Sequence, residues 1–526
     1  MIPEELYVQI HKNMPIICVD VILKTEDNGV LMIKRDREPL LGKWGFIGGR
    51  INRGEKLEQA AQRKLHEELG LSLDNLKLIK SGYETIFEGD PFGHGEGTHS
   101  INTCYLAEVS NEELAKIQLD QNHSGYKIFH DVEDNWHSYL KEALKDSGII
   151  KPKFIPVCEP TIGEKELEYV TDAVKSGWVS SAGKYITKFE EGFAAYCNQK
   201  HGIACSNGTT ALHLAVEALG IGKGDEVIVP TFTMAASANA VIYAGAKPVF
   251  VDSELDTWNM DISKIEAKIT PNTKAIMIVH TYGHPIDMDR VNEIANKHNL
   301  FVIEDAAEAH GAEYKGRKIG SLSDVACFSF YGNKIMTTGE GGMVVTNHDE
   351  VAERAKKLRN HFFGTPRFLH QEIGYNHRMT NIQAALGLAQ LEKLDILAEA
   401  RRKNAQLYNS LLSEVPGLTL PPEKEWAKNV YWMYGLLVQP EFGMTMPELC
   451  KSLLDRGIDS RTFFIGMHKQ PCYQHGNAGI EGEFPGSDEL ESKGFYLPSS
   501  SHLTNEQIQR IAQAIKDIYN ANRYSK

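Results

Sequence analysis

The spacing of hydrophobic and polar positions predicts an α/β protein. Short runs rich in valine and isoleucine, typical of strands, alternate with longer stretches in which apolar residues recur at helical spacing. The runs at 226–230, 248–252 and 275–279 are almost continuously apolar, as expected of strands buried on both faces. We therefore expect a largely parallel sheet covered by helices in the central part of the chain.

The first 150 residues have a pattern of their own. Strand-like runs at 15–23 and 30–35 precede an amphipathic stretch at 54–71. The apolar stripe of that stretch consists of Leu57, Ala60, Ala61, Leu65 and Leu69. From about residue 391 the pattern changes again, to a long helix followed by a smaller α/β unit.

A chain of 526 residues is too long for one ordinary core, so several domains are expected. Pro152 and Pro156 disfavour helix on both sides of a short join, which makes this segment a plausible boundary. The predicted domains are residues 1–150, 151–390 and 391–526.

Composition excludes several classes of protein. A formal net charge of −14 argues against a nucleic-acid surface, which needs clustered lysine and arginine. No apolar run approaches the roughly 20 residues of a membrane span, and the N-terminus lacks the pattern of a secretory signal peptide. The eight cysteines are scattered without a Cys-x-x-Cys pair, so we expect reduced thiols. These features predict a cytoplasmic protein that binds neither nucleic acid nor membrane.

A polar bend between the apolar runs 327–330 and 343–345 carries a single cation, Lys334. A lysine held between apolar strands loses hydration, so its ammonium pKa falls and the free amine can attack an aldehyde cofactor. The alternative is an ordinary surface lysine at the end of a strand. The neighbouring motifs favour the chemical role.

Two of those motifs lie upstream of the bend. The apolar run 300–304 leads into Asp305, and an acid at the carboxyl end of a strand can pair with the ring nitrogen of a pyridoxal cofactor. The stretch 202–215 reads as a strand, a turn of small residues and a helix, whose first amides suit a phosphate.

Taken in order, the phosphate turn, the strand acid and the strand lysine resemble the sugar aminotransferase family named after DegT, DnrJ, EryC and StrS. Further motifs that carry the resemblance are residues 176–181, 303–308, 337–342 and 375–381. The resemblance implies a fold-type I enzyme dependent on pyridoxal 5′-phosphate, with a large, mostly parallel sheet domain and a small C-terminal α/β domain.

The same resemblance implies the roles of individual residues. Lys334 would hold the cofactor and act as the catalytic base. The other cofactor-binding residues would be Gly208, Thr209, Asp305, Glu308, Ser329 and Asn376, the last reaching the phosphate bound by the neighbouring subunit. Either Phe232 or Met234 would cover one face of the pyridine ring.

The implied reaction is transfer of an amino group from glutamate to C4 of a GDP-linked 4-keto-6-deoxy sugar. Arg461 is either a contact to the diphosphate of that substrate or a structural salt-bridge partner. We expect a homodimer with shared active sites, or a tetramer built from it. A dehydratase on the same scaffold would replace Lys334 by histidine, and a non-catalytic scaffold would not need Lys334 or Asp305.

The N-terminal region resembles the Nudix family, an α/β/α sandwich. Its box, G-x5-E-x7-R-E-U-x-E-E-x-G-U with U apolar, starts at Gly49 and includes Glu55, Glu67 and Glu68. A glycine carbonyl and helix carboxylates are the oxygen ligands that Mg²⁺ prefers beside a diphosphate. One position departs from the box, because Lys64 stands where it has glutamate.

The departure resembles the branch of that family that hydrolyses GDP-mannose at the sugar carbon. Residues that look like that branch are Asp20, Arg37, Arg50, His99, Asn122 and His123. The resemblance implies that Gly49, Glu68 and Asn122 hold the metal, supported by Glu55 and Glu67. Arg37 and Arg50 would bind the GDP leaving group, and His123 would be the general base. A domain that binds nucleotide sugars without catalysis is the alternative.

Overall fold

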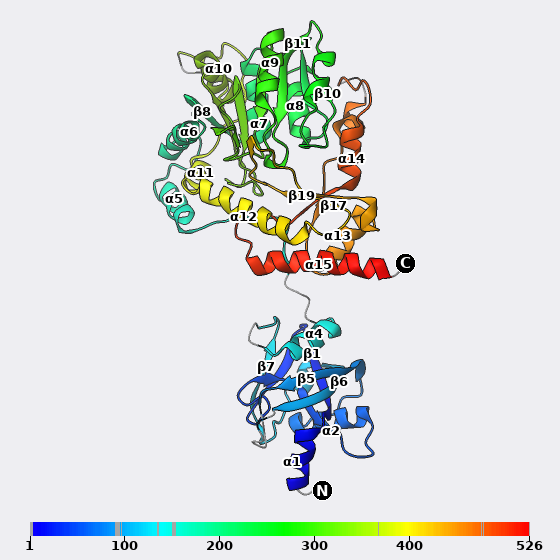
Figure 1. The fold of residues 1–526 in the computed structure, drawn as a ribbon. Helices are drawn as coiled ribbons and strands as arrows, with labels where there is room; N and C mark the ends of the chain where they lie inside the picture. The colour runs from blue at the N-terminus through cyan, green and yellow to red at the C-terminus, as the bar shows by residue number, and fades with distance from the viewer. Residues whose placement is uncertain are drawn as a thin grey trace. The chain divides into compact units, whose positions relative to one another are not determined.

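The computed structural model describes residues 4–89, 95, 97–133, 136–149, 154–366, 368–474, 476 and 478–524. The chain divides into two compact units, Met1–Phe154 and Ile155–Lys526 (Figure 1). The centre of the expected join, residues 151–153, lies outside the described residues. In the described part of the chain, no helix is long and apolar enough to cross a membrane.

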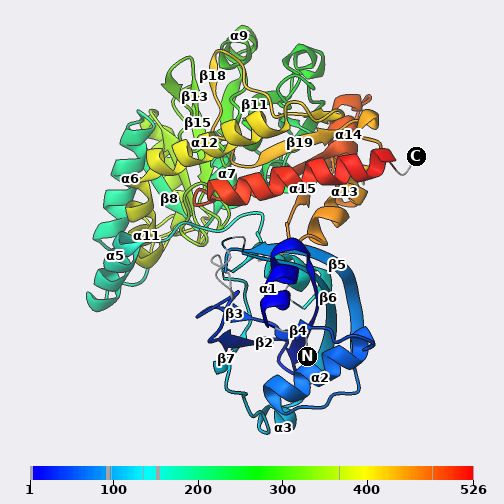
Figure 2. The same ribbon diagram turned by 60° about the horizontal axis from the view of Figure 1, so that its bottom comes forward.

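The first unit is built on a mixed sheet. Its strands are β1 (Ile16–Thr25), β2 (Val30–Arg35), β3 (Trp44–Gly45), β4 (Ile47–Arg50), β5 (Lys77–Phe87), β6 (Thr98–Val109) and β7 (His123–Phe129). They pair in the order β3-β2-β1-β6-β5, with β4 also on β1 and β7 also on β2. Its helices are α1 (Glu4–Asn13), α2 (Leu57–Leu69), α3 (Asn111–Leu114) and α4 (Ser138–Ser147) (Figures 1 and 2).

Both faces of this sheet are covered by helices. Val21 of β1 packs in a buried cluster with Leu65 of α2, whereas the next residue, Ile22, packs in a second cluster with Leu140 of α4. Successive side chains of a strand point to opposite faces, so one strand contributes to both clusters. The result is the α/β/α sandwich that the sequence predicts.

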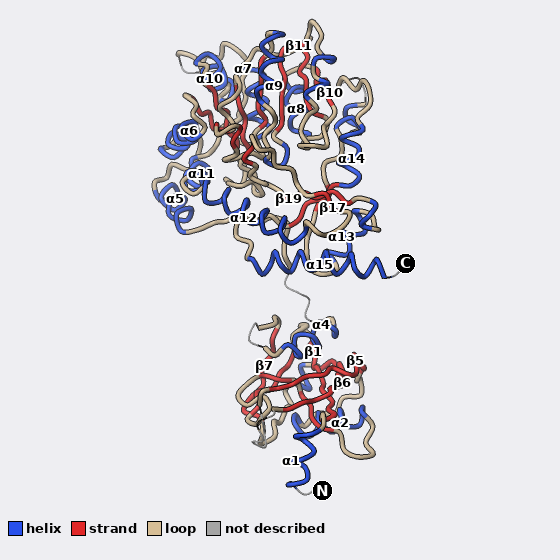
Figure 3. The backbone as a smooth tube through the Cα atoms, in the orientation of Figure 1, coloured by secondary structure: helices blue, strands red, loops and turns tan. Residues whose placement is uncertain are grey.

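The second unit is built on a larger sheet, whose strands are drawn in red among blue helices in Figure 3. The strand order of this sheet is β10-β9-β11-β12-β15-β16-β8. These strands are β8 (His201–Cys205), β9 (Glu226–Pro230), β10 (Lys247–Val251), β11 (Thr273–Val279), β12 (Phe301–Asp305), β15 (Val325–Ser329) and β16 (Gly342–Thr346). Neighbours are parallel from β10 to β15, and β16 runs antiparallel to both β15 and β8. The largely parallel sheet is therefore confirmed.

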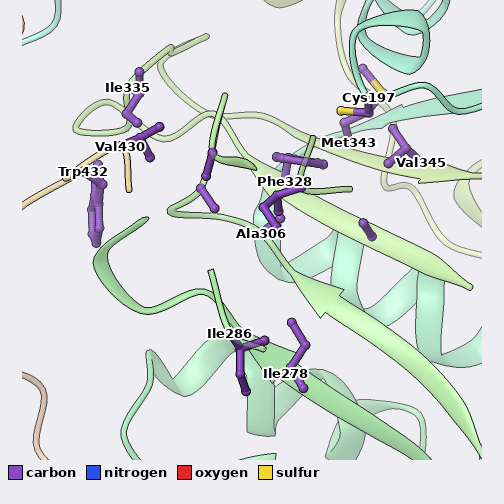
Figure 4. Packing of buried hydrophobic residues seen from close by; sticks show 14 of the residues in the cluster. Cys197, Ile278, Ile286, Ala306, Phe328, Ile335, Met343, Val345, Val430 and Trp432 are labelled. Atoms are coloured by element: carbon purple, nitrogen blue, oxygen red, sulfur yellow. The ribbon is translucent and has the colours of Figure 1, made fainter. Parts of the chain in front are cut away.

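The apolar strands of this sheet separate two cores. In β15, Ala326 and Phe328 belong to one buried cluster, whereas Val325 and Cys327 belong to the other. Figure 4 shows part of the first cluster, in which Trp432, Val430 and Ile335 group on one side of the view. Burial on both faces explains why these strands lack the polar alternation of a half-exposed sheet.

Helices cover this sheet. The unit also contains a smaller antiparallel sheet with the strand order β17-β19-β21-β20. The helices are α5 (Glu164–Lys175), α6 (Lys184–Tyr196), α7 (Gly208–Ala218), α8 (Ala235–Tyr243), α9 (Met288–His298), α10 (Asp349–Arg359), α11 (Asn381–Leu391), α12 (Leu394–Leu412), α13 (Met446–Leu454), α14 (Pro485–Lys493) and α15 (Asn505–Tyr524). The remaining strands are β13 (Glu313–Tyr314), β14 (Arg317–Lys318), β17 (Leu418–Thr419), β18 (Ala427–Lys428), β19 (Tyr434–Val438), β20 (Arg461–Thr462) and β21 (Gly494–Leu497). Helices α12 and α15 pack side by side (Figure 2).

Candidate functional sites

Three residues singled out in the second unit, Asp305, Ser329 and Lys334, lie where strands of its large sheet end. Asp305 is the last residue of β12 and Ser329 is the last residue of the adjacent parallel strand β15. The bend that follows β15 contains Lys334, whose amide donates to the Tyr331 carbonyl. In open α/β sheets, ligands bind outside the carboxyl ends of the strands, which is where these residues lie.

The Lys334 side chain is enclosed by this edge and is only 10% exposed. Its Nζ lies 3.5 Å from the centroid of the Trp432 ring and 3.9 Å from Glu308 Oε1. Burial lowers the pKa of the Lys334 ammonium, and the charges of Glu308 and Asp305 oppose that shift. The side chain is therefore a desolvated amine and not a surface lysine.

Two buried carboxyl groups face this lysine. Asp305 accepts hydrogen bonds from the Ser237 hydroxyl at 2.7 Å and from the Ala307 amide at 3.2 Å. Glu308 Oε2 accepts a hydrogen bond from the Tyr282 amide at 2.7 Å. Burial raises the pKa of both carboxyl groups, and the nearby Lys334 opposes the shift. The carboxyl groups of Asp305 and Glu308 can therefore place a negative charge beside a cationic ligand and exchange protons with Lys334.

The first turn of α7 approaches the end of β15 closely enough to form a small cradle. A Cβ atom added to Gly208 would lie 2.7 Å from Ser329 Cβ, so a side chain there would fill the space. Asn207 caps the helix by accepting from the Thr210 amide at 2.9 Å. The amides of Gly208 and Thr209 have no acceptor in the described part of the chain.

These free amides at a helix N-terminus, together with the Ser329 hydroxyl, suit a phosphate group. Lys334, Asp305 and this cradle all lie at the carboxyl ends of the parallel strands, with groups of the kinds that bind an aldehyde, a ring nitrogen and a phosphate. The residues present therefore fit pyridoxal 5′-phosphate.

The structure distinguishes the two residues proposed to cover the ring. Phe232 is fully buried and packs against the rings of Tyr282, Phe463 and Phe464. Met234 is 59% exposed at the N-cap of α8, one turn before the Ser237 that binds Asp305. Of the two, Met234 has the side chain that is accessible to a ligand.

Two other predicted residues lie at the surface. Asn376 is exposed. Two residues later, the backbone of Arg378 forms an isolated β-bridge with Cys205, which ends β8 just before the cradle. Arg461 is exposed in β20 and forms an ion pair with the buried Asp459. Arg461 thus has a salt-bridge partner, which was one of its two predicted roles. More than half of its side chain still faces solvent.

Sequence reasoning did not identify Trp432 or His310. Trp432 donates its indole N–H to the Asn333 carbonyl at 2.8 Å and covers the Lys334 amine. His310 is fully buried beside Phe328 and Phe330, and burial lowers its pKa to about 3. Trp432 lies about a hundred residues after the lysine, so no local pattern marks it, whereas His310 stands two residues after the motif 303–308.

The first unit contains a cavity of about 360 Å³. Its lining includes Asp20, Arg35, Gly49, Arg50, Arg63 and Lys64. Arg35 was not predicted. Its Nε atom is buried and has no hydrogen-bond partner among the described residues. Arg37, two residues later, is exposed and lies outside this lining, because the bend after β2 turns it toward solvent.

The carboxylates of the Nudix box are already paired with cations of the chain. Glu55 binds the guanidinium of Arg63 at 2.7 and 2.8 Å, and this contact lowers the pKa of the carboxyl to about 2. Glu67 binds Lys64 at 2.7 Å and Arg63 at 3.1 Å. Glu68 is buried, which raises its pKa to about 7, and it accepts from the Gly48 amide.

Lys64 points into the centre of the predicted metal site. Its Nζ is 3.9 Å from Glu68 Oε1, and a Cβ added to Gly49 would meet Lys64 Cε at 3.0 Å and Nζ at 3.4 Å. No cluster of three or more acidic, histidine or cysteine ligands occurs among the described residues. The described side chains therefore do not fit the predicted Mg²⁺ site.

The predicted general base and its neighbour both contact Asp120. His123 Nδ1 lies 2.6 Å from Asp120 Oδ1, and the side-chain NH2 group of Asn122 donates to Asp120 Oδ2 at 2.8 Å. The Oδ1 atom of Asn122, the predicted ligand atom, is buried and has no hydrogen-bond partner among the described residues. Neither residue lines the cavity, and His123 is the first residue of strand β7. His99 lies between Thr98 and Ser100, which line the cavity, so alternation turns it to the other face, where it contacts Glu84.

Both units match known families. Residues 160–516 match the model of the DegT/DnrJ/EryC1/StrS aminotransferase family, and residues 14–154 match the NUDIX domain. GDP-perosamine synthase of Caulobacter vibrioides is 46% identical over 366 residues, which are 69% of this chain and 98% of the relative. GDP-perosamine synthase of Escherichia coli O157:H7 is 45% identical over 368 residues, which are 70% of this chain and 99% of the relative.

A solved structure supports the fold of the second unit. The S. venezuelae protein DesV is 36% identical, with a TM-score of 0.65. The match covers 70% of this chain and 99% of DesV.

Proposed function

Because the chain belongs to the DegT/DnrJ/EryC1/StrS aminotransferase family, we propose that it transfers an amino group from glutamate to C4 of GDP-4-keto-6-deoxymannose. The products are GDP-perosamine and 2-oxoglutarate. The two relatives named GDP-perosamine synthase support this choice of sugar, since they align over almost their whole length. The enclosed amine of Lys334, between Trp432 and two buried carboxyl groups, carries the proposal.

The residues of the sheet edge would hold the cofactor that the family implies. The amides of Gly208 and Thr209 and the hydroxyl of Ser329 would bind its phosphate, and Asp305 would face its ring nitrogen. Met234 would cover one face of the ring. Pyridoxal 5′-phosphate, when bound, supplies the aldehyde that carries the amino group and a ring that withdraws electrons.

Lys334 supplies the covalent anchor and the mobile proton. As a neutral amine its Nζ would hold the cofactor through its aldehyde, and when it is not so bound it would carry a proton between donor and acceptor carbons. Glu308 lies 3.9 Å from the Lys334 Nζ, close enough to exchange that proton. Burial raises the pKa of its carboxyl group, so Glu308 can hold the proton as well as release it. Trp432 restricts the position of the amine and excludes water from one side of it.

The proposal includes a homodimer with shared active sites, or a tetramer built from it. Asn376 is exposed on a segment that pairs with the end of β8, beside the phosphate cradle. It is therefore available to a second copy of the chain, where it would reach the cofactor phosphate.

Replacing Lys334 tests the assignment directly. Lys334→Ala should reduce amino transfer by about 10³-fold or more, because it removes both the nucleophile and the proton carrier. Borohydride reduction and peptide mapping of the parent should label Lys334. Lys315→Ala, which changes a half-exposed lysine of the same unit, should leave the rate unchanged. A label on a different lysine would exclude the proposed role.

The sugar itself is tested by the mass of the product. Another 4-keto or 3-keto sugar nucleotide is the alternative, favoured by a 38% identical relative named dTDP-3-amino-3,4,6-trideoxy-alpha-D-glucose transaminase. Incubation with glutamate and each keto sugar in turn identifies the accepted one.

We also propose that the N-terminal unit binds a sugar nucleotide and does not hydrolyse it with Mg²⁺. The observation in favour is that Glu55 and Glu67 are paired with Arg63 and Lys64. If the protein releases GDP from GDP-mannose only when Mg²⁺ is present, this proposal is wrong and the unit is a hydrolase. Reaction in ¹⁸O-water would then show whether carbon or phosphorus is attacked.

A further inference from the structure

The position of Lys64 carries an inference beyond sugar-nucleotide binding. Its ammonium lies between the helix carboxylates, 2.7 Å from Glu67 and 3.9 Å from Glu68. On its other side it approaches the backbone of Gly49, where an added Cβ would lie 3.4 Å from Nζ. The ammonium thus joins the glycine strand β4 to the carboxylates of α2.

We propose that the Lys64 ammonium is a built-in cation that takes the place of a divalent metal, so that the cavity binds a nucleoside diphosphate without a metal ion. This inference rests on the proposed binding role of the N-terminal unit. It adds the identity of the cation that faces the diphosphate.

The charge of the cavity matches such a ligand. Among the described residues, its lining contains four arginine or lysine side chains and two acidic ones. The arginine and lysine residues are Arg35, Arg50, Arg63 and Lys64, and the acidic residues are Asp20 and Glu38. The Nε of Arg35 is buried and lacks a hydrogen-bond partner in the described part of the chain. A buried donor without an acceptor is costly, so a phosphate oxygen that accepts from it would be favoured. A volume of about 360 Å³ lies in the usual range of small-molecule sites.

Lys64 also opposes metal binding at the same place. A divalent ion coordinated by Glu68 would come within a few ångströms of the ammonium, and like charges at that distance repel strongly in a partly buried site. The ammonium is held by Glu67, and the Lys64 side chain is only 20% exposed, so moving the ammonium away would break that contact. The position beside Glu67 and Glu68 can therefore hold one cation, and that cation is the Lys64 ammonium.

Hydrogen–deuterium exchange of the full chain with GDP tests the inference. Exchange is read by peptide, so protection of residues 47–69 is separated from any protection by GDP bound in the second unit. We expect the same protection of 47–69 with Mg²⁺ and with EDTA. Protection that requires Mg²⁺ would overturn the role of Lys64 while leaving the binding role of the unit intact.

Variants at the same helix make the test specific. Lys64→Met should raise the GDP concentration for half-protection about tenfold, as expected for losing one charge-assisted contact. Lys64→Glu, which restores the acid of the box, should bind GDP only when Mg²⁺ is present. Lys56→Met, at the exposed start of α2, is the matched control and should behave as the parent.

Two outcomes contradict the inference outright. Unchanged protection in Lys64→Met would show that the ammonium does not face the ligand. Absence of protection in the parent at any GDP concentration would exclude both this inference and the binding role. Thermal unfolding of each variant confirms that its N-terminal unit is folded.

Discussion

At the scale of residues, the second unit depends on buried charged groups that compensate each other. Lys334 and Glu308 lie 3.9 Å apart, both largely withdrawn from solvent. Removing one partner of such a pair leaves a buried group whose charge is no longer compensated. The protons of the two groups therefore belong to the pair, and a change in Glu308 should alter the reactivity of Lys334.

His284 offers a residue-scale prediction about acid stability. Its Nδ1 donates to the Pro285 carbonyl at 2.7 Å and its Nε2 accepts from the Lys424 amide at 3.1 Å, so the folded state requires the neutral ring. Burial lowers the pKa of His284 from 6.5 to about 4. Below pH 6.5 the unfolded chain binds a proton that the folded chain does not, so stability falls as pH falls toward 4.

Between pH 7.5 and 5 this group should cost the second unit about 2 kcal/mol of unfolding free energy. Calorimetry of the parent and of His284→Gln at both pH values measures the difference, which should be smaller in the variant. His348→Gln, at an exposed position, is the control and should keep the parental dependence. An equal loss on acidification in His284→Gln would refute this role of His284.

At the scale of elements, the cofactor cradle depends on how closely α7 approaches β15. Gly208 has no side chain, and this absence allows the helix N-terminus to reach the end of the strand. The Asn207 cap satisfies the third amide of the helix and leaves the first two available. The anion site is therefore a property of two elements in contact.

Gly208→Ala tests this contact. The added methyl would lie 2.7 Å from Ser329 Cβ, so the helix or the strand end must move. We expect cofactor affinity to fall about tenfold or more, with a stability loss of about 1–3 kcal/mol. Titration with pyridoxal 5′-phosphate followed by visible absorbance measures the affinity. Gly222→Ala, whose Cβ would be 3.4 Å from the nearest atom, should retain the parental affinity, and equal affinities in both variants would refute the cradle.

At the scale of the whole molecule, the chain consists of two units with separate cores. The buried clusters of the first unit contain residues from 19 to 144, and those of the second contain residues from 155 to 518. The relatives that match the second unit align over 98% and 99% of their own length. A further division of that unit near residue 390 stays a prediction, although the small sheet begins after it.

The fragment 154–526 should therefore fold and transfer amino groups at a rate within about twofold of the full chain, as expected of a domain with its own core. Steady-state rates with glutamate and the keto sugar compare the two proteins. The full chain with Lys64→Met serves as a control, since it changes only the N-terminal cavity. A fragment that folds but has lost activity would show that the N-terminal unit contributes to the reaction.

The sequence by itself determined the elements and the order of the chemical groups. Strands buried on both faces, such as 226–230, are visible as apolar runs because every side chain must leave water. Asp305 and Lys334 follow such runs, so their place at the carboxyl ends of strands could be predicted. The Nudix box and its departure at Lys64 were equally visible, because their spacing is local.

Only the tertiary structure decided which side chains meet. Trp432 reaches Lys334 across about a hundred residues, and Phe232 is removed from the site because the core encloses its ring. Arg35 enters the N-terminal cavity and Arg37 does not, since the direction of a side chain at a strand end depends on the local bend. Whether Lys64 is an exposed lysine or the cation of a site depends on its distances to Gly49 and Glu68, which come from packing α2 against β4. Contacts of this kind are set by the free energy of the whole core, which no local pattern contains.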